Sequence, residues 1–474
     1  MIDAKAAGMQ SKDRTGYRLL AENWRQVLAM LFLGFSAGLP LLLIFSTLSL
    51  WLREAGVDRS AVTYFSWAAL GYSFKFVWAP LVDKLPLPFL HQLMGKRRSW
   101  LLLAQVMVMT AMVWMAMNDP STASGLHYMA FAAVMLGFSS ATQDIVIDAF
   151  RIEAVQSDVQ ALMASTYVAG YRVGMIVAGA AALYLADWLG TTRENYLYSA
   201  WQLTYLAMAG AMLVGVFTTL SIREPARTQE SSYLHTSRDY FRFVLLFAGF
   251  VAAIILAYLS LSDVVTATKS WLVQAGAIEE LASFVAEAFR LFAALLAALF
   301  AGWLLVRIHL ADRRMLRDTY IDPVADFFRR YGKAAILILL LVGFYRVSDI
   351  VLGVISNVFY QDMGFSKDQI ATVTKVFGIW MTILGGFLGG FLTLRYGVIR
   401  ILMLGAVMTV VTNLLFIPVA NNPGDVMLLY VVIGADNITA GLASAAFIAY
   451  LSSLTSLSFT AVQYAIFSSL MTLF

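Results

Sequence analysis

The sequence has no cysteine, only four histidines and few charged residues. The absence of thiols excludes a cysteine nucleophile and any Cys-ligated zinc or iron–sulfur site. The histidines fall in predicted loops or at helix ends, which argues against a histidine proton relay or a metal site. Charged residues make up 13% of the chain, about half the share typical of soluble domains. These shortages exclude a disordered chain, a disulfide-stapled secreted scaffold and a soluble multidomain enzyme.

Apolar residues are abundant instead, and they occur in long runs. They make up 60% of the 474 residues, and the mean hydropathy is +0.75. An apolar run of about 18 or more residues is typical of a membrane-spanning helix. We therefore predict an all-α polytopic membrane protein. The predicted spans are 27–51, 62–82, 99–118, 126–150, 161–189, 198–221, 241–262, 281–306, 334–361, 369–394, 398–418 and 425–451, with an incomplete one from about 458.

The basic residues between these spans predict the orientation of the chain. Of the 33 Lys and Arg residues, 23 fall on the same side as the N-terminus and five on the opposite side, and the rest lie within spans. Because Lys and Arg are retained on the cytoplasmic side, the N-terminus is predicted to be cytoplasmic. The net charge of +4 does not gather on one soluble face, so nucleic acid is not expected as a partner.

The polar segments divide the chain into four predicted parts, with no connection long enough for a soluble catalytic domain. We therefore expect a transporter and not an enzyme. The C-terminal bundle is expected to hold helices 7–10 and part of 11, so that the chain is truncated. The parts are a cytoplasmic N-terminal segment (1–26), a six-helix bundle (27–221), cytoplasmic linkers around an inserted helix pair at about 241–306 (222–333), and an incomplete C-terminal bundle (334–474).

Charged and polar residues inside the spans are the candidate site. An ionised side chain at the bilayer centre costs at least about 2.5–3.5 kcal/mol, so such residues are expected to face a water-filled cavity. Asp144 and Asp148 share one helical face, and two nearby carboxylates cannot both ionise cheaply there, so they are the proton-coupling candidates. The substrate-binding candidates are Lys75, Gln143, Tyr171, Arg172, Tyr345, Arg346, Asp349, Lys375, Asp436 and Asn437.

Structural roles are open alternatives for several of these residues. Asp148 could simply pair with Arg151, and the long stem of Lys75 could carry its ammonium to the interface. Arg290 is expected to pair with Glu287 one turn away. The residues Gly34, Gly38 and Pro40 are predicted to bend the first helix, although close helix packing alone would also explain the glycines.

The connection after the second span resembles a motif of major facilitator transporters. In that superfamily an acid at a helix end is followed by a glycine and a basic cluster, and Asp83 and the run Gly95, Lys96, Arg97 and Arg98 match this pattern with a longer spacer. The resemblance implies a two-bundle fold with two extra helices inserted mid-chain. It also implies that these residues form a charge latch on the cytoplasmic face.

Longer stretches resemble the AmpG-type muropeptide permeases. The matching stretches are LGFSAGLPL (33–41), FKFVWAPLVDK (74–84), SSATQDIVIDAF (139–150), AGYRVGMIVAG (169–179), DPVADFFRRYGKA (322–334) and residues 443–470. This resemblance implies import of GlcNAc–anhydroMurNAc and its peptides across the bacterial inner membrane by proton symport. It further implies a role in cell-wall recycling and, in some bacteria, in β-lactamase induction. The implied partners are the lipid bilayer, a muropeptide and protons, with no cofactor and a monomeric chain.

Two other functions remain open beside this one. Acetyl-CoA carriers are distant relatives with a similar first half, but a nucleotide cargo would call for more cations than the four named above. A membrane-embedded transferase would need a catalytic constellation in a large loop, and the sequence has none. Aromatic residues Trp67, Trp78 and Trp380 are candidate sugar-stacking surfaces, or anchors at the membrane interface.

Overall fold

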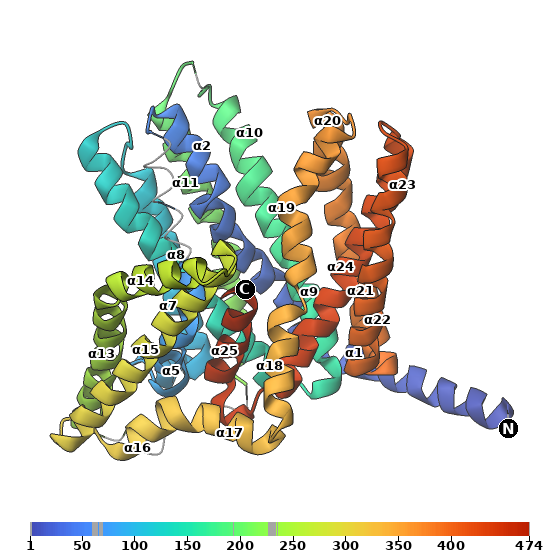
Figure 1. The fold of residues 1–474 in the computed structure, drawn as a ribbon. Coiled ribbons are helices and arrows are strands. Elements are labelled where there is room, and N and C mark those ends of the chain that lie inside the picture. Colours follow the sequence, from blue (N-terminus) through green and yellow to red (C-terminus); the bar gives the residue numbers. More distant parts are fainter. Residues whose placement is uncertain are drawn as a thin grey trace. The chain divides into compact units, whose positions relative to one another are not determined.

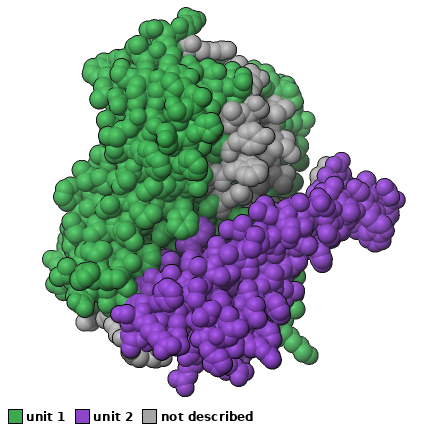
Figure 2. All heavy atoms as spheres, turned by 90° about the vertical axis from the view of Figure 1, so that its left-hand side faces the viewer, with its two compact units in different colours: residues 1–76, 86–228, 333–474 green, residues 77–85, 229–332 purple. Residues whose placement is uncertain are grey.

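The computed structural model describes residues 2–58, 65, 70–192, 194–225, 234 and 236–473. The described residues form helices, turns and loops, with no strand among them. Ten of these helices are long and apolar enough to cross a membrane. The chain forms two compact units, which we describe in turn (Figure 2). Unit 1 holds residues 1–76, 86–228 and 333–474, and unit 2 holds residues 77–85 and 229–332.

The first half of unit 1 contains most of the predicted N-terminal spans (Figure 1). Part of the predicted span at 62–82 lies outside the described residues, and the span predicted at 27–51 is interrupted at Phe45. Here Trp51 and Trp201 stack at 5.7 Å in a buried apolar core. The helices are α1 (Ile2–Ile44), α2 (Ser46–Glu54), α4 (Leu70–Phe74), α6 (Leu90–Met94), α7 (Lys96–Ala116), α8 (Ala123–Ala154), α9 (Gln160–Ile176), the π-helix η4 (Val177–Ala181), α10 (Ala182–Trp188), α11 (Tyr198–Ala211) and α12 (Leu213–Ser221).

The second half of unit 1 follows from Lys333 to the C-terminal end. The span predicted at 334–361 is two helices, because the chain leaves helical geometry at Arg346, where ψ is 3°. The helices are α18 (Ala334–Phe344), α19 (Val347–Asp362), α20 (Lys367–Ile370), the π-helix η6 (Ala371–Phe377), α21 (Gly378–Tyr396), α22 (Val398–Leu414), α23 (Phe416–Asn421), α24 (Val426–Leu454) and α25 (Thr460–Leu473).

Glycine allows a very close helix contact in unit 1, between α1 and α9. A Cβ on Gly34 or Gly38 would lie 2.1 Å from the carbonyl oxygen of Tyr167 or Tyr171, respectively. The contact is reciprocal, because a Cβ on Gly170 of α9 would lie 1.9 Å from a carbonyl oxygen of α1. The two backbones therefore touch directly, as at small-residue interfaces in membranes. Pro40 lies inside α1, which continues to Ile44.

Unit 2 is built on two long helices, α13 (Ser237–Ser260) and α15 (Glu279–Arg307). They lie against each other in opposite directions, since the Arg290 Nε donates to the Tyr258 carbonyl oxygen at 2.7 Å and Gly249 faces Leu305. The predicted Arg290–Glu287 pair is confirmed at 3.3 Å. The remaining helices are α5 (Ala79–Lys84), α14 (Ser262–Gln274), which was not predicted, α16 (Arg313–Leu316), the π-helix η5 (Arg317–Ile321) and α17 (Asp322–Tyr331).

Candidate functional site

The middle of α8 carries a cluster of polar side chains that face neighbouring helices of unit 1. Asp144 is 8% exposed, and the hydroxyl of Tyr167 on α9 donates to its Oδ1 at 3.5 Å. Gln143 is fully buried, and its Nε2 donates to the Ser36 hydroxyl of α1 at 3.5 Å. A third contact joins the hydroxyls of Tyr72 and Ser140 at 2.6 Å. Three helices thus converge on the α8 positions that the sequence predicts.

Two further predicted residues of the first half lie beside this cluster. Lys75, 7% exposed, follows α4 and attracts Asp144 electrostatically. The Tyr171 ring lies 6.0 Å from that of Tyr167, on the same side of α9. Lys75 and Asp144 are both buried, and the attraction between their opposite charges lowers the cost of keeping both away from water. The predicted residues Lys75, Gln143, Asp144 and Tyr171 are brought together.

Two arginines of opposite halves of unit 1 also approach each other. Arg172 of α9 and Arg346, between α18 and α19, repel each other electrostatically. Arg346 donates to the Ser444 hydroxyl of α24 at 3.1 Å, and Arg172 contacts the Met175 sulfur at 3.9 Å. Both side chains are half-buried, and an anion bound near them would offset the repulsion between their like charges.

Other predicted residues of the second half contact neighbouring helices of that same half. The Tyr345 hydroxyl donates to the Leu402 carbonyl oxygen at 3.0 Å, and its ring stacks on Phe447. Asp436 accepts from Thr412 at 3.2 Å, and Asn437 accepts from Thr382 at 2.8 Å. The remaining candidates are Lys375, which is exposed on η6, Trp380, which is 58% exposed, and Trp67 and Asp349, whose side chains lie outside the described part of the chain.

A buried arginine, Arg151, joins the two halves of unit 1. It lies near the helix ends that carry the Lys- and Arg-rich loops, and we call the region around Arg151, Gly390 and Ser452 the basic end. Arg151 has no exposed surface, and it donates to Asp148 Oδ1 at 3.2 Å. Its other terminal nitrogen donates to the Ser452 hydroxyl of α24 at 2.7 Å, and its guanidinium lies 5.2 Å from the Tyr464 ring centre of α25. Asp148 therefore faces Arg151 and not the Asp144 cluster alone, so the pairing left open by the sequence does form.

Glycine again allows close contact at this junction. A Cβ on Gly390 of α21 would lie 2.3 Å from the Ser165 hydroxyl and 3.2 Å from the Ala161 carbonyl oxygen, both on α9. The Ser165 side chain is 1% exposed. The two halves are thus packed tightly at the basic end, and any movement that separates them must break this contact and the Arg151–Ser452 hydrogen bond.

The predicted latch residues of unit 1 bind two glutamates that sequence reasoning missed. Arg97 Nε donates to Glu153 of α8 at 2.9 Å, and both side chains are buried. Glu224 accepts from the backbone nitrogens of Arg97 and Arg98 at 2.7 and 3.0 Å. Gly95 has φ 85°, and a Cβ there would meet Glu224. Lys96 is 5% exposed, and the fifth latch residue, Asp83, is buried on α5 of unit 2.

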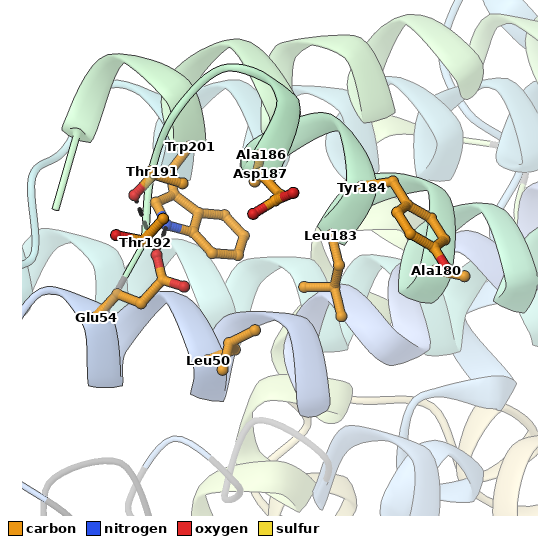
Figure 3. Close-up of a pocket in the computed structure, with 10 residues that line it drawn as sticks. All are labelled: Leu50, Glu54, Ala180, Leu183, Tyr184, Ala186, Asp187, Thr191, Thr192 and Trp201. Carbon is orange, nitrogen blue, oxygen red and sulfur yellow. Dashed lines mark hydrogen bonds between the residues drawn. The ribbon is translucent and has the colours of Figure 1, made fainter. Parts of the chain in front are cut away.

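A pocket of about 540 Å³ opens at the opposite end of the first half (Figure 3). In it, Glu54 Oε2 accepts from Trp201 Nε1 at 2.8 Å and from the Thr191 hydroxyl at 3.1 Å. None of the predicted site residues lines this pocket, and Glu54 was missed because it ends a span and reads as an ordinary interfacial acid. The lining residues are Leu50, Glu54, Ala180, Leu183, Tyr184, Ala186, Asp187, Thr191, Thr192 and Trp201.

Comparison with known proteins places this geometry in a transporter context. The chain is 29% identical over 437 residues to a protein of Rickettsia conorii named putative transporter AmpG 4, covering 92% of this chain and 84% of that protein. It is 27% identical over 443 residues to the anhydromuropeptide permease of Escherichia coli K12, covering 93% and 70%. A family model described as acetyl-coenzyme A transporter 1 matches residues 26–224.

A solved structure shows the same fold. The proton:xylose symporter XylE of the major facilitator superfamily, bound to 6-bromo-6-deoxy-D-glucose, aligns with a TM-score of 0.55 at 13% identity, covering 96% of this chain and 86% of that one. The all-α membrane fold predicted from sequence is confirmed, as is the expectation of a transporter in place of an enzyme.

Proposed function

We propose that this chain, which is similar to proteins named AmpG and anhydromuropeptide permease and has the fold of a major facilitator transporter, imports GlcNAc–anhydroMurNAc and its peptides into the cytoplasm. The import is driven by proton symport, across the bacterial inner membrane, and serves cell-wall recycling. The observation that carries the proposal is the similarity to proteins named AmpG and anhydromuropeptide permease over more than nine-tenths of the chain.

The arginine pair supports an anionic cargo. Arg172 and Arg346 come from opposite halves of unit 1 and repel each other, so a bound carboxylate would relieve the repulsion. Muropeptides carry carboxylates, and a carboxylate can accept two hydrogen bonds from a guanidinium. A carboxylate held between the halves would also couple their movement, because it bonds to both.

The contacts at the basic end support an alternating-access mechanism. With the N-terminus cytoplasmic, the packed Arg151–Ser452 and Gly390–Ser165 contacts close the cytoplasmic side. Import then requires that these contacts open once the cargo is bound, as the two halves rock around a site near the midplane. The latch residue Arg97 and its partner Glu153 hold the ends of α7 and α8 together during this step.

The two carboxylates of α8 give a route by which a proton controls that opening. Protonation of Asp148 would remove the negative charge that orients Arg151, and so weaken the hydrogen bond from Arg151 to Ser452. Asp144 lies one turn away on α8, near Lys75. A loss of charge at Asp148 therefore changes the electrostatic potential at the polar side chains around Asp144. Proton binding at Asp148 and opening of the Arg151–Ser452 contact on the cytoplasmic side are then coupled.

The first prediction tests this coupling by uptake. Labelled anhydromuropeptide is supplied to vesicles with and without an inward proton gradient, for the wild type and for Asp144→Asn and Asp148→Asn. We expect gradient-driven uptake by the wild type and a loss of at least about tenfold in each variant, because each removes a proton-binding group. The control is Asp263→Asn, the same chemical change at an exposed position of α14. Uptake that is independent of the gradient would end the symport proposal.

Acetyl-CoA is the second candidate, favoured by the family model that matches residues 26–224. That match covers the first half of the chain only. The same vesicles supplied with labelled acetyl-CoA separate the two cargoes, because we expect no saturable uptake of it. Saturable acetyl-CoA uptake without muropeptide uptake would replace the cargo proposal and leave the transporter fold intact.

A further inference from the structure

Helices α13 and α15 of unit 2 have the length and exposure of a membrane-spanning hairpin. Both are candidate spans, and they expose large apolar side chains such as Leu256, Leu259, Phe292 and Leu296, each more than 60% exposed. Polar contacts inside the hairpin are satisfied, because Arg290 lies over the Tyr258 ring at 3.7 Å and pairs with Glu287. Their ends therefore lie at the depth of the lipid headgroups.

The segment from α16 to α17 is fixed to one of these ends. A buried core joins Phe243 and Leu246 of α13 with Ala311 and Met315, next to α16. Within unit 2, Figure 1 shows α16 beside the lower ends of α13 and α15, and α17 running on from it at about the same level. A segment that runs at the level of the ends of two spanning helices lies along the membrane surface.

This corner of unit 2 exposes arginine and apolar side chains together. We call Arg307, Arg313 and Arg314 the arginine corner; all three are exposed. The exposed apolar neighbours are Trp303, Ile308 and Leu310, and the Arg307 guanidinium lies 5.3 Å from the Trp303 ring centre.

The arginine corner differs from neighbouring arginines by lacking carboxylate partners. Arg317 pairs with Asp322 at 3.1 Å, and Arg330 pairs with Asp326 at 2.9 Å. Over the part of unit 2 that the structure describes, no ion pair forms at the arginine corner. The nearby acid, Asp312, instead accepts from the backbone nitrogen at the start of α16, at 2.7 Å.

We propose that the arginine corner binds the phosphate of an anionic phospholipid. Guanidinium groups bind phosphate oxygens through paired hydrogen bonds, and basic clusters beside spanning helices attract anionic lipids. The apolar neighbours select a lipid over free phosphate, because Trp303, Ile308 and Leu310 can enter the acyl-chain boundary while the guanidinium groups stay at the headgroup. This inference is independent of the cargo.

The test measures lipid binding to the full chain purified in detergent, by native mass spectrometry. Phosphatidylglycerol and phosphatidylcholine are titrated against the wild type, the single variant Arg314→Gln and the triple variant Arg307→Gln, Arg313→Gln, Arg314→Gln. The matched control is Lys269→Gln, which removes a cation that pairs with Glu279 elsewhere in unit 2. Thermal unfolding of each variant without lipid shows whether the fold is retained, and Arg314→Gln keeps the test valid if the triple variant unfolds.

We expect the wild type to prefer phosphatidylglycerol, with a loss of about fivefold in affinity for each arginine removed and none for Lys269→Gln. The preference should weaken as salt is raised, because the contact is electrostatic. Equal binding of both lipids, or unchanged phosphatidylglycerol binding by the triple variant, would overturn the proposal. Full competition by millimolar inorganic phosphate would overturn it too, since the ligand would then be free phosphate.

Discussion

At the scale of single residues, Arg151 is the side chain on which the closure of the basic end depends. It is fully buried, and its guanidinium contacts Asp148 of its own helix, Gln160 of α9, and Ser452 and the Tyr464 ring of the opposite half. Its Nε has no hydrogen-bond partner among the described residues, so the group is incompletely satisfied. Burying a cation costs free energy even where it has partners, because the charge loses its hydration.

The second prediction concerns this contact. Replacing Arg151 with glutamine removes a charge-assisted hydrogen bond to Ser452, worth about 1.5–3 kcal/mol, and so shifts the chain toward opening at the basic end. Because the chain has no cysteine, Ser165→Cys supplies a single thiol buried between the halves. We expect maleimide labelling of that thiol to be at least about tenfold faster with Arg151→Gln. An unchanged labelling rate would show that Arg151 does not hold the halves together.

The third prediction concerns the arginine pair. Arg172→Met removes one of the two cations at similar side-chain volume. An anionic cargo should therefore bind about tenfold or more weakly, which is measured as a rise in apparent KM for uptake.

Lys75→Met should weaken cargo binding as well if Lys75 faces the cargo. Lys269 of α14 serves as the comparison, since Lys269→Met removes a cation that pairs with Glu279 in unit 2. An unchanged KM for Arg172→Met would remove that residue from the cargo site.

At the scale of elements, the contact between α1 and α9 depends on glycine at several positions. Gly170 meets the Leu31 carbonyl oxygen and Gly38 meets that of Tyr171, so both helices contribute. The sequence predicts bending at Gly34 and Gly38. In the structure these glycines face a neighbouring helix, and α1 continues past them.

The fourth prediction follows from this contact. Gly170→Ala should destabilise the fold by about 1–3 kcal/mol, because the new methyl group meets backbone atoms that cannot turn away. Gly210→Ala, within α11, is the control, since nothing lies within 4 Å of its Cβ position and alanine favours the helix. Thermal unfolding in detergent should therefore move in opposite directions for the two variants. A shift in the same direction would contradict the packing argument.

The sequence predicts the long elements well and their contacts poorly. Apolar runs place α7 and α8 within a few residues, because a spanning helix must be long and apolar. The break at Arg346 is missed, because the apolar residues on both sides of it make 334–361 look like one continuous span that contains a few polar residues. The sequence also does not reveal which residue a polar side chain contacts. Asp436 and Asn437 are predicted site residues only because they are polar residues inside a span. In the structure they accept hydrogen bonds from Thr412 and Thr382.

At the scale of the whole molecule, the distribution of basic residues predicts which side of the membrane each loop faces. The basic loops follow alternate spans, and the loop between α7 and α8 carries no Lys or Arg. Retention of basic residues on the cytoplasmic side then predicts that this loop is periplasmic.

The fifth prediction tests this orientation. Gln92 and Ser121 are both exposed, at the two ends of α7, and either can be changed to the only cysteine of the chain. We expect a membrane-impermeant maleimide to label Ser121→Cys in intact cells whose outer membrane has been made permeable. Gln92→Cys should label only after the inner membrane is opened. The reverse pattern would invert the topology and make the proposed importer an exporter.

The direct backbone contact between α1 and α9 limits how the molecule can change shape. Helices that meet through long side chains can slide, since rotamers adjust to a small displacement. Where glycines meet carbonyl oxygens, no rotamer is available to absorb a shift. These two helices must therefore move as one rigid body. A tilt of α9 at Arg172 would then also move Ser36 of α1 and Gln143, which donates a hydrogen bond to Ser36.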